Sequence, residues 1–341
     1  MNIKKKLAVF LLLALPITLG FPAPVRGAPA SLVSAPSVVL LDAGSKRILF
    51  SRAPHRRQPP ASTAKLMTAL VVLDHLPLDH WVTISSRVEH LEASKLYLRG
   101  GERLVVRDLL KALLMNSAND AATALAVETA GSELHFSELM NEKARLLGAR
   151  NTRFRNASGL PAEGQYSTAY DMALIMREAM SRAIISSILK QKHALIRTEG
   201  GRRFTLKNHN KMLWSRAPVV GKTGYTRRAR HCFVGYVGYG YKTAIVAVLG
   251  SRRLWRDLNL LCRRHIGFRK PNVAILSFGS RGNDVMRLQH ALKRAGYFPS
   301  RVTGYFGART TQSVIEFQKA NGLRADAKVG PATRKALTRY L

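Results

Sequence analysis

The chain has 341 residues, a length that suits two domains. A hydrophobic fraction of 46% with 22% charged residues excludes a wholly disordered or collagen-like chain, and its 2 cysteines exclude a disulfide-dense scaffold. The formal net charge of +35 predicts a polyanionic neighbour, such as a membrane surface, an anionic wall polymer or nucleic acid, and it says nothing about the fold.

Residues 1–30 have the pattern of a secretory signal peptide. Lys4-Lys5-Lys6 precede an apolar run from Leu7 to Leu19, and Ala28-Pro29-Ala30 fits a small-residue cleavage site. The run is short for a membrane span, although an uncleaved anchor is the alternative. Removing these lysines and Arg26 leaves a charge of +31. The sequence therefore predicts an exported protein of the periplasm or cell wall, with at most peripheral membrane contact.

The predicted main domain, residues 31–267, has strand patterns at both ends and helical patterns between them. Residues 38–41 and 47–50 predict a strand pair, and a helix follows Pro59-Pro60. Further helices are expected at 106–115, 120–130, 137–147 and 169–180, strands at 219–225, 231–239 and 241–249, and a last helix at 254–262. This order predicts an α+β fold in which helices flank a mainly antiparallel sheet.

A small second domain is predicted at residues 278–341. The basic, proline-containing stretch at residues 263–274 predicts a linker, and the domain bounds assign residues 268–277 to it. Helical patterns at 283–295, 308–320 and 331–340, separated by turns rich in glycine and proline, predict a small three-helix C-terminal domain. Its expected core positions are Val285, Leu288, Leu292, Val314, Phe317 and Leu337.

Ser62-Thr63-Ala64-Lys65 places a hydroxyl and an amine three residues apart at a predicted helix start. Residues at this spacing are neighbours on a helix surface, so the amine can reach the serine oxygen. A desolvated lysine with a lowered pKa can then act as general base for an otherwise weak nucleophile. The spacing alone is a weak signal, because Ser187 and Lys190 repeat it in another helical run.

Two later motifs strengthen the prediction. Ser117-Ala118-Asn119 lies between two predicted helices, where a loop can present a hydroxyl and an amide to a cleft. Lys222-Thr223-Gly224 lies on a predicted strand, whose edge can align an extended peptide. Taken alone, Ser117 and Asn119 could belong to a helix-capping turn, and Lys222 could be a surface lysine. The three motifs in this order indicate one active site.

In this order the motifs resemble the signature of penicillin-binding proteins and class A β-lactamases. The likeness is most specific to the serine-type D-Ala-D-Ala carboxypeptidases, the low-molecular-mass penicillin-binding proteins of peptidase family S11, and it covers about residues 36–267. It is carried by residues 60–68, 116–122, 166–169, 208–214 and 221–226. The resemblance implies a fold of the β-lactamase/transpeptidase type.

The resemblance also implies roles for the reacting residues. Ser62 would attack the carbonyl between the two terminal D-alanines, Lys65 would accept its proton, and Ser117 would relay a proton to the leaving amine. Asn119 would bind the substrate peptide.

The resemblance also implies substrate-binding roles for the residues of the strand motif and those near it. Lys222 and Thr223 would hold the substrate's terminal carboxylate, with Gly224 assigned to the same binding strand. The backbone N–H groups of Ser62 and Tyr225 would form the oxyanion hole. Arg256 lies where the family often has an arginine facing the carboxylate, although the alignment needs a gap there.

The chain departs from the family pattern in places. Ala118 replaces the usual glycine, a change expected to have little effect, and His209 occupies a position that is often basic, so substrate affinity can differ. No segment resembles the acid-bearing loop with which class A β-lactamases deacylate. β-Lactams are therefore expected as covalent inhibitors that acylate Ser62 and remain.

The C-terminal segment resembles the three-helix peptidoglycan-binding domain over about residues 278–337. The likeness is carried by Gly279, Gly282, Leu288-Gln289, Gly296-Tyr297, residues 303–307, Phe317-Gln318, Gly322-Leu323, Asp326 and Gly330. Thr303 departs from the usual aspartate, and the turn is expected to survive. The alternative is a helical spacer with no ligand.

Neither a metal nor a cofactor is expected. The chain has no H-E-x-x-H or C-x-x-C motif, and His75 and His80 do not share a helix face. Cys232 in a predicted strand and Cys262 in a predicted helix are either a disulfide, which export permits, or two buried free thiols.

The leading hypothesis is a serine D-Ala-D-Ala carboxypeptidase that trims peptidoglycan stem peptides and is held to the wall polymer by its C-terminal domain. A D,D-endopeptidase of peptidoglycan cross-links would use the same site. A third hypothesis is a non-catalytic wall-binding or β-lactam-sensing protein. A nucleic-acid partner is not expected, because no nucleic-acid-binding module is recognisable and the chain is expected to be exported.

Overall fold

The computed structural model describes residues 33–92, 94–215, 218–239, 242–266, 275–337 and 340. The predicted signal peptide and residues 268–274 of the predicted linker lie outside this part. Within it, none of the helices has both the length and the apolar character needed to cross a bilayer.

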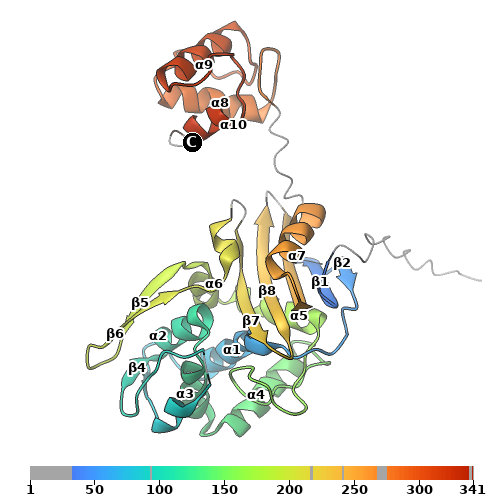
Figure 1. Ribbon diagram of the computed structural model, residues 1–341, viewed down its shortest axis with the longest axis vertical. Coiled ribbons are helices and arrows are strands. Elements are labelled where there is room, and N and C mark those ends of the chain that lie inside the picture. Colours follow the sequence, from blue (N-terminus) through green and yellow to red (C-terminus); the bar gives the residue numbers. More distant parts are fainter. Residues whose placement is uncertain are drawn as a thin grey trace, which may run out of the picture.

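A five-stranded antiparallel sheet is the centre of the main domain, and it joins the two ends of that domain as the sequence predicts (Figure 1). The strand order is β2-β1-β9-β8-β7. The strands are β1 (Ser37–Asp42), β2 (Ile48–Arg52), β7 (Val219–Thr226), β8 (Arg230–Tyr239) and β9 (Lys242–Ser251). Strand β7, which carries the Lys222-Thr223-Gly224 motif, is therefore an edge strand.

Helices cover both faces of this sheet, which explains why β1 is apolar at successive positions. Val39 and Leu41 point into the larger core with α1 (Lys65–His75) and α5 (Ala169–Ser181). Val38 and Leu40 point into a second core, which α7 (Leu254–Leu261) covers. Because successive side chains of a strand face opposite sides, burial of both faces requires a continuous apolar run.

The two cysteines lie in different cores. Cys232 belongs to the cluster on the α1 side and Cys262 to the cluster on the α7 side. Both are free and buried, and burial raises the pKa of each thiol to about 12. Of the two alternatives, the structure has two buried free thiols.

The remaining helices form a lobe beside the β7 edge of the sheet. They are α2 (Val106–Lys111), the π-helical turn η3 (Ala112–Asn116), α3 (Asn119–Ala130), α4 (Glu133–Leu146) and α6 (Ala183–Lys190). The predicted helix at 106–115 is thus an α-helix that ends in a π-helical turn. Helix α4 begins earlier than predicted because the Ser132 side chain caps it by accepting a hydrogen bond from His135 N.

Several short elements of the structure have no counterpart among the predicted ones. Two antiparallel strand pairs lie outside the main sheet: β3 (Trp81–Thr83) with β4 (Arg103–Val105), and β5 (His193–Arg197) with β6 (Arg203–Lys207). Three 3-10 turns were also missed: η1 (Ala61–Ala64), η2 (Ser86–His90) and η4 (Lys211–Trp214). The prediction that the basic linker stretch begins at Arg263 is wrong, because the π-helical turn η5 (Cys262–Ile266) continues α7 through it.

The C-terminal domain has the three predicted helices, α8 (Asn283–Arg294), α9 (Ala308–Ala320) and α10 (Pro331–Leu337). The six predicted core positions are all buried in one cluster. The predicted third helix runs to residue 340, whereas α10 ends at Leu337 and residues 338–339 lie outside the described part.

Two buried glutamines each hold a loop of this domain in the same way. Gln289 donates to Thr303 Oγ1, Tyr305 O and Thr310 Oγ1, and its Oε1 accepts from the backbone at 303 and 304. Gln318 donates to Asp326 Oδ1, Lys328 O and Thr333 Oγ1, and accepts from the backbone N–H of residue 327. Thr303 therefore has the position in one loop that Asp326 has in the other, and the turn survives the departure from aspartate as expected.

Candidate active site

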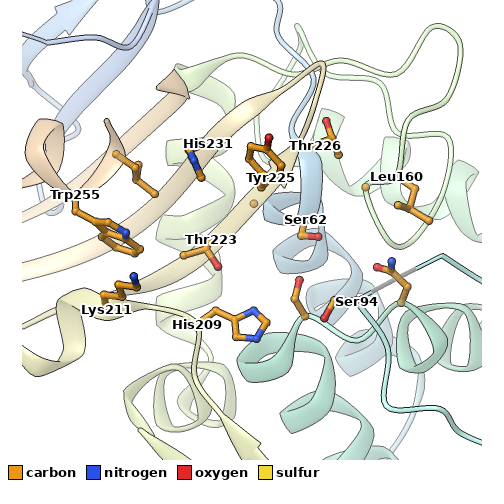
Figure 2. A pocket seen from close by; sticks show the side chains of 15 residues that line it. Ser62, Ser94, Leu160, His209, Lys211, Thr223, Tyr225, Thr226, His231 and Trp255 are labelled. Carbon is orange, nitrogen blue, oxygen red and sulfur yellow. The ribbon is translucent and has the colours of Figure 1, made fainter. Parts of the chain in front are cut away.

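A pocket of about 340 Å³ lies between the β7 edge and the helical lobe (Figure 2). Six of the nine predicted site residues line it: Ser62, Ser117, Asn119, Thr223, Gly224 and Tyr225. Lys65 and Lys222 lie buried beneath it, with their amines on Ser62 and Ser117. Arg256 is the exception, because it is exposed on α7 and only its neighbours Leu254 and Trp255 line the pocket.

Ser62 lies in η1, immediately before α1, and Lys65 is the first residue of α1. One helical turn therefore carries both groups, and Lys65 Nζ lies 3.0 Å from Ser62 Oγ. The preceding residue, Ala61, has a left-handed backbone with φ 48°, which L-residues rarely adopt. Backbone strain of this kind is concentrated at functional sites, where the surrounding structure maintains it.

The buried Lys65 amine has three hydrogen-bond partners. They are Ser62 Oγ at 3.0 Å, Asn119 Oδ1 at 2.7 Å and Ser158 O at 2.6 Å. The amide nitrogen of Asn119 donates to Glu92 O, so its oxygen faces the lysine. The Asn119 and Ser158 oxygens can only accept, and they take the two N–H groups of a neutral amine. Its lone pair is then left facing the Ser62 hydroxyl.

The environment of Lys65 favours this neutral form. Burial lowers the pKa of the Lys65 amine well below its usual value of 10.5, and the positive charge of Lys222 lowers it further. Asp120 and Glu133 act in the opposite direction but do not cancel the effect. A neutral amine that faces a hydroxyl is the arrangement a general base requires.

Ser117 and Lys222 form a second hydroxyl–amine pair at the same pocket. Ser117 is the residue that follows η3, and its left-handed backbone (φ 61°) makes the turn between η3 and α3. Lys222 Nζ donates to Ser117 Oγ and to Thr223 O, each at 2.9 Å. Burial lowers the pKa of Lys222 to about 7, so its charge changes near neutral pH.

Gly224 brings strand β7 against the turn that carries Ser62. A Cβ atom at this position would lie 3.0 Å from Ser62 N and 3.1 Å from Thr63 N. Any side chain would therefore push the strand away from the nucleophile. The glycine of the motif is needed for close approach of two backbones.

The pocket also contains residues that the motifs did not predict. They are Ser94, Gly159, Leu160, His209, Lys211, Thr226, His231, Leu254 and Trp255. Burial lowers the pKa of His209, and the positive charge of Lys222 lowers it further. Thr226, His231, Leu254 and Trp255 lie on strands β7 and β8 and on helix α7, which the sequence predicts, while the others come from loops and turns that no periodic pattern marks; the resemblance pointed to His209.

Within the described ranges, no cluster of three or more histidine, cysteine, aspartate or glutamate residues is placed to hold a metal ion.

Comparison with known proteins agrees with this geometry. Residues 25–253 match the family model of the peptidase S11 D-alanyl-D-alanine carboxypeptidases, and residues 281–337 match that of a putative peptidoglycan binding domain. D-alanyl-D-alanine carboxypeptidase DacF of Bacillus subtilis is 34% identical over 223 residues, which cover 64% of this chain and 57% of that protein. DacB2 of Mycobacterium tuberculosis is 32% identical over 228 residues, which cover 66% of this chain and 78% of that protein.

A solved structure has the same fold. The crystal structure of a D-alanyl-D-alanine carboxypeptidase from Mycobacterium tuberculosis H37Rv superposes with a TM-score of 0.67 at 30% sequence identity, covering 73% of this chain and 97% of that one. With the hydroxyl–amine pairs converging in one pocket and the family model matching most of the main domain, the chain belongs to the peptidase S11 family of D-alanyl-D-alanine carboxypeptidases.

Proposed function

We propose that this protein is a serine D-Ala-D-Ala carboxypeptidase that removes the terminal D-alanine from peptidoglycan stem peptides. The observation that carries the proposal is the buried Lys65 amine, which lies within hydrogen-bond distance of Ser62 Oγ, Asn119 Oδ1 and Ser158 O. In its neutral form the amine donates its two N–H groups to the two acceptors Asn119 and Ser158, and its lone pair serves Ser62.

The first step is acylation. Ser62 Oγ attacks the carbonyl carbon between the two terminal D-alanines while its proton passes to Lys65 Nζ. The negative charge that develops on the carbonyl oxygen is stabilised by the backbone N–H groups of Ser62 and Tyr225. This pairing is supported by the close approach of β7 to the Ser62 turn at Gly224.

Collapse of the tetrahedral intermediate then breaks the C–N bond. The proton held by Lys65 returns through the Ser117 hydroxyl to the leaving nitrogen, so that neutral Lys65 is restored and D-alanine departs. Lys222, which donates to Ser117, orients this hydroxyl. Water then attacks the Ser62 ester, again with Lys65 as the base, and releases the shortened peptide.

Substrate binding is assigned to the pocket wall. Asn119 has one amide hydrogen on Glu92 O, and the second is left for a carbonyl of the substrate peptide. The terminal carboxylate is assigned to Lys222 and to Thr223, which is half-buried on the pocket wall. Arg256 is exposed beyond the pocket, so in this proposal it contributes only a distant positive charge.

The wider role follows from the second domain and the charge. We infer that the protein is exported, that its C-terminal domain binds peptidoglycan, and that the charge of +31 left after removal of the signal peptide favours anionic wall polymers. β-Lactams are expected to acylate Ser62 in place of the substrate.

The test is D-alanine release from a pentapeptide that ends in D-Ala-D-Ala. Wild type should release D-alanine, and Ser62→Ala should lower the rate by at least about a thousandfold, because a nucleophile has no substitute in covalent catalysis. Ser187→Ala is the matched control, since Ser187 has the same spacing from Lys190 but lies exposed on α6. Equal release by wild type and Ser62→Ala would refute the mechanism. Cleavage of cross-linked muropeptides in preference to the pentapeptide would identify an endopeptidase, and acylation by penicillin without turnover of any peptide would identify a sensor.

A further inference from the structure

The third partner of the Lys65 amine comes from a loop that no sequence motif marks. Ser158 O accepts from Lys65 Nζ at 2.6 Å, across 93 residues of chain. We propose that Asn156 is a positioning residue, which fixes the Ser158 carbonyl against Lys65 and thereby keeps the amine lone pair directed at Ser62. This proposal rests on the proposed function, because it assumes that Lys65 is the base.

The Asn156 side chain holds the turn at Ser158 with each of its polar atoms. Its Oδ1 accepts from Gly159 N at 2.7 Å and from Ser158 Oγ at 3.2 Å, and its Nδ2 donates to Leu160 O at 3.0 Å. Leu160 N in turn donates to Ser158 Oγ at 3.2 Å. The Ser158–Gly159 peptide therefore cannot rotate its carbonyl away from Lys65 without breaking several of these bonds.

The same turn contacts the backbone beside the nucleophile. Gly159 has φ +78°, and a Cβ atom there would lie 2.0 Å from Ala61 O, a distance no structure tolerates. Thr68 Oγ1, one turn beyond Lys65 on α1, donates to Ala157 O at 2.6 Å. Successive carbonyls of the loop are thus held by Lys65 and Thr68, while its glycine packs on the residue before Ser62.

Charged groups around Lys65 come from several elements. Lys222 on β7 lowers the pKa of Lys65, Asp120 on α3 and Glu133 on α4 raise it, and His209 before η4 lines the pocket. Asn156 is neutral, so the loop orients the amine without adding a counter-charge. A carboxylate at position 156 would add a negative counter-charge near Lys65, so the role of this position can be tested by changing its charge as well as its geometry.

The experiment compares the pH dependence of kcat/KM for D-alanine release in two variants of the full chain. Asn156→Ala releases the turn, so the ammonium form of Lys65 loses a fixed acceptor. The acid limb should move to lower pH by about half a unit, and kcat should fall about tenfold because the lone pair is no longer directed. Asn156→Asp keeps the acceptor and adds a negative charge, which favours the ammonium form, so the acid limb should move about half a unit to higher pH.

Asn141→Ala is the matched control. Asn141 also fastens this loop, because its side chain accepts from Phe154 N at 2.7 Å and donates to Phe154 O at 2.9 Å. Its loss should lower the thermal unfolding midpoint without moving the acid limb. If Asn156 has a purely structural role, its two variants should also have a lower unfolding midpoint and an unmoved acid limb.

Opposite shifts of the acid limb in the two Asn156 variants, with none in Asn141→Ala, would support the proposal. If Asn156→Ala fails to fold, the upward shift in Asn156→Asp carries the test alone. An unmoved limb in every Asn156 variant that folds would overturn the positioning role and leave the proposed function standing. Absence of D-alanine release from wild type would instead contradict the proposed function, and the positioning role would fall with it.

Discussion

The catalytic pocket and the C-terminal domain both bury polar side chains, but they bury different kinds. The pocket buries Lys65 and Lys222, two amines that bind protons readily in water. The C-terminal domain buries Gln289 and Gln318, neutral amides whose donors and acceptors are paired with loop backbone and side chains.

This difference separates function from architecture. A neutral amide that regains its hydrogen bonds inside the protein costs little to bury and fixes the loop that it binds. A buried lysine lowers the stability of the folded state, because folding must either remove an ammonium group from water or deprotonate it, and each costs free energy. We therefore expect loss of a buried lysine to reduce activity while raising stability, and loss of a buried glutamine to lower stability while leaving the activity of the pocket unchanged.

Lys222→Met should have the larger effect. Loss of the group that holds Ser117 should lower the rate of D-alanine release by at least about a hundredfold. The folded-state pKa of about 7 lies below the usual 10.5, so in wild type the unfolded state binds the extra proton and stability rises with pH between these values. The gain in unfolding midpoint should therefore be greatest at pH 7 or below, about 3 °C or more, and should vanish toward pH 10.5.

Scanning calorimetry at pH 7 and pH 10 checks this prediction. A Lys222→Met variant that is less stable than wild type at pH 7 would show that the buried amine is part of the architecture, and the contrast between the two regions would then be wrong.

Gln318→Met should have a smaller effect, confined to the C-terminal domain. The substitution removes the bonds to Asp326, Lys328, Ala327 and Thr333, which should lower the stability of this domain by about 2–4 kcal/mol. The kinetic constants for a soluble pentapeptide should stay at their wild-type values, while retention on isolated walls should fall.

Gln312→Met on the exposed face of α9 is the control, because Gln312 is exposed and donates to Glu316 on the same helix. Equal losses from Gln312→Met and Gln318→Met would contradict the role assigned to the buried amide.

The sequence predicted those parts of the molecule that short-range patterns specify. Helix α9 lies at the predicted residues 308–320, because an apolar stripe and a flanking glycine at each end mark it. Ser62 and Lys65 share one helical turn, so their contact follows from their spacing alone. The convergence of Ser117 and Lys222 on the same pocket was predicted from the order of the motifs and not from any local rule.

What the sequence did not predict depends on contacts between distant segments. Strands β3 and β4 have three residues each, which is too short for a recognisable alternation of apolar and polar residues. The Ser158 carbonyl reaches Lys65 only because Gly159 packs on Ala61, which is a tertiary contact with no periodic signal. Arg256 was placed by an alignment that needed a gap, and the structure puts it outside the pocket lining.

The central claim is that Lys65 is a neutral amine at the pH where the enzyme works. NMR titration of protein labelled with 13C at the lysine ε carbon measures this directly, with Lys65→Arg to assign the signal and exposed Lys190 as the internal reference. The buried environment predicts a midpoint for Lys65 well below 10.5, because burial and Lys222 both lower the pKa. A Lys65 signal that titrates at about 10.5, as an ordinary exposed lysine does, would contradict it.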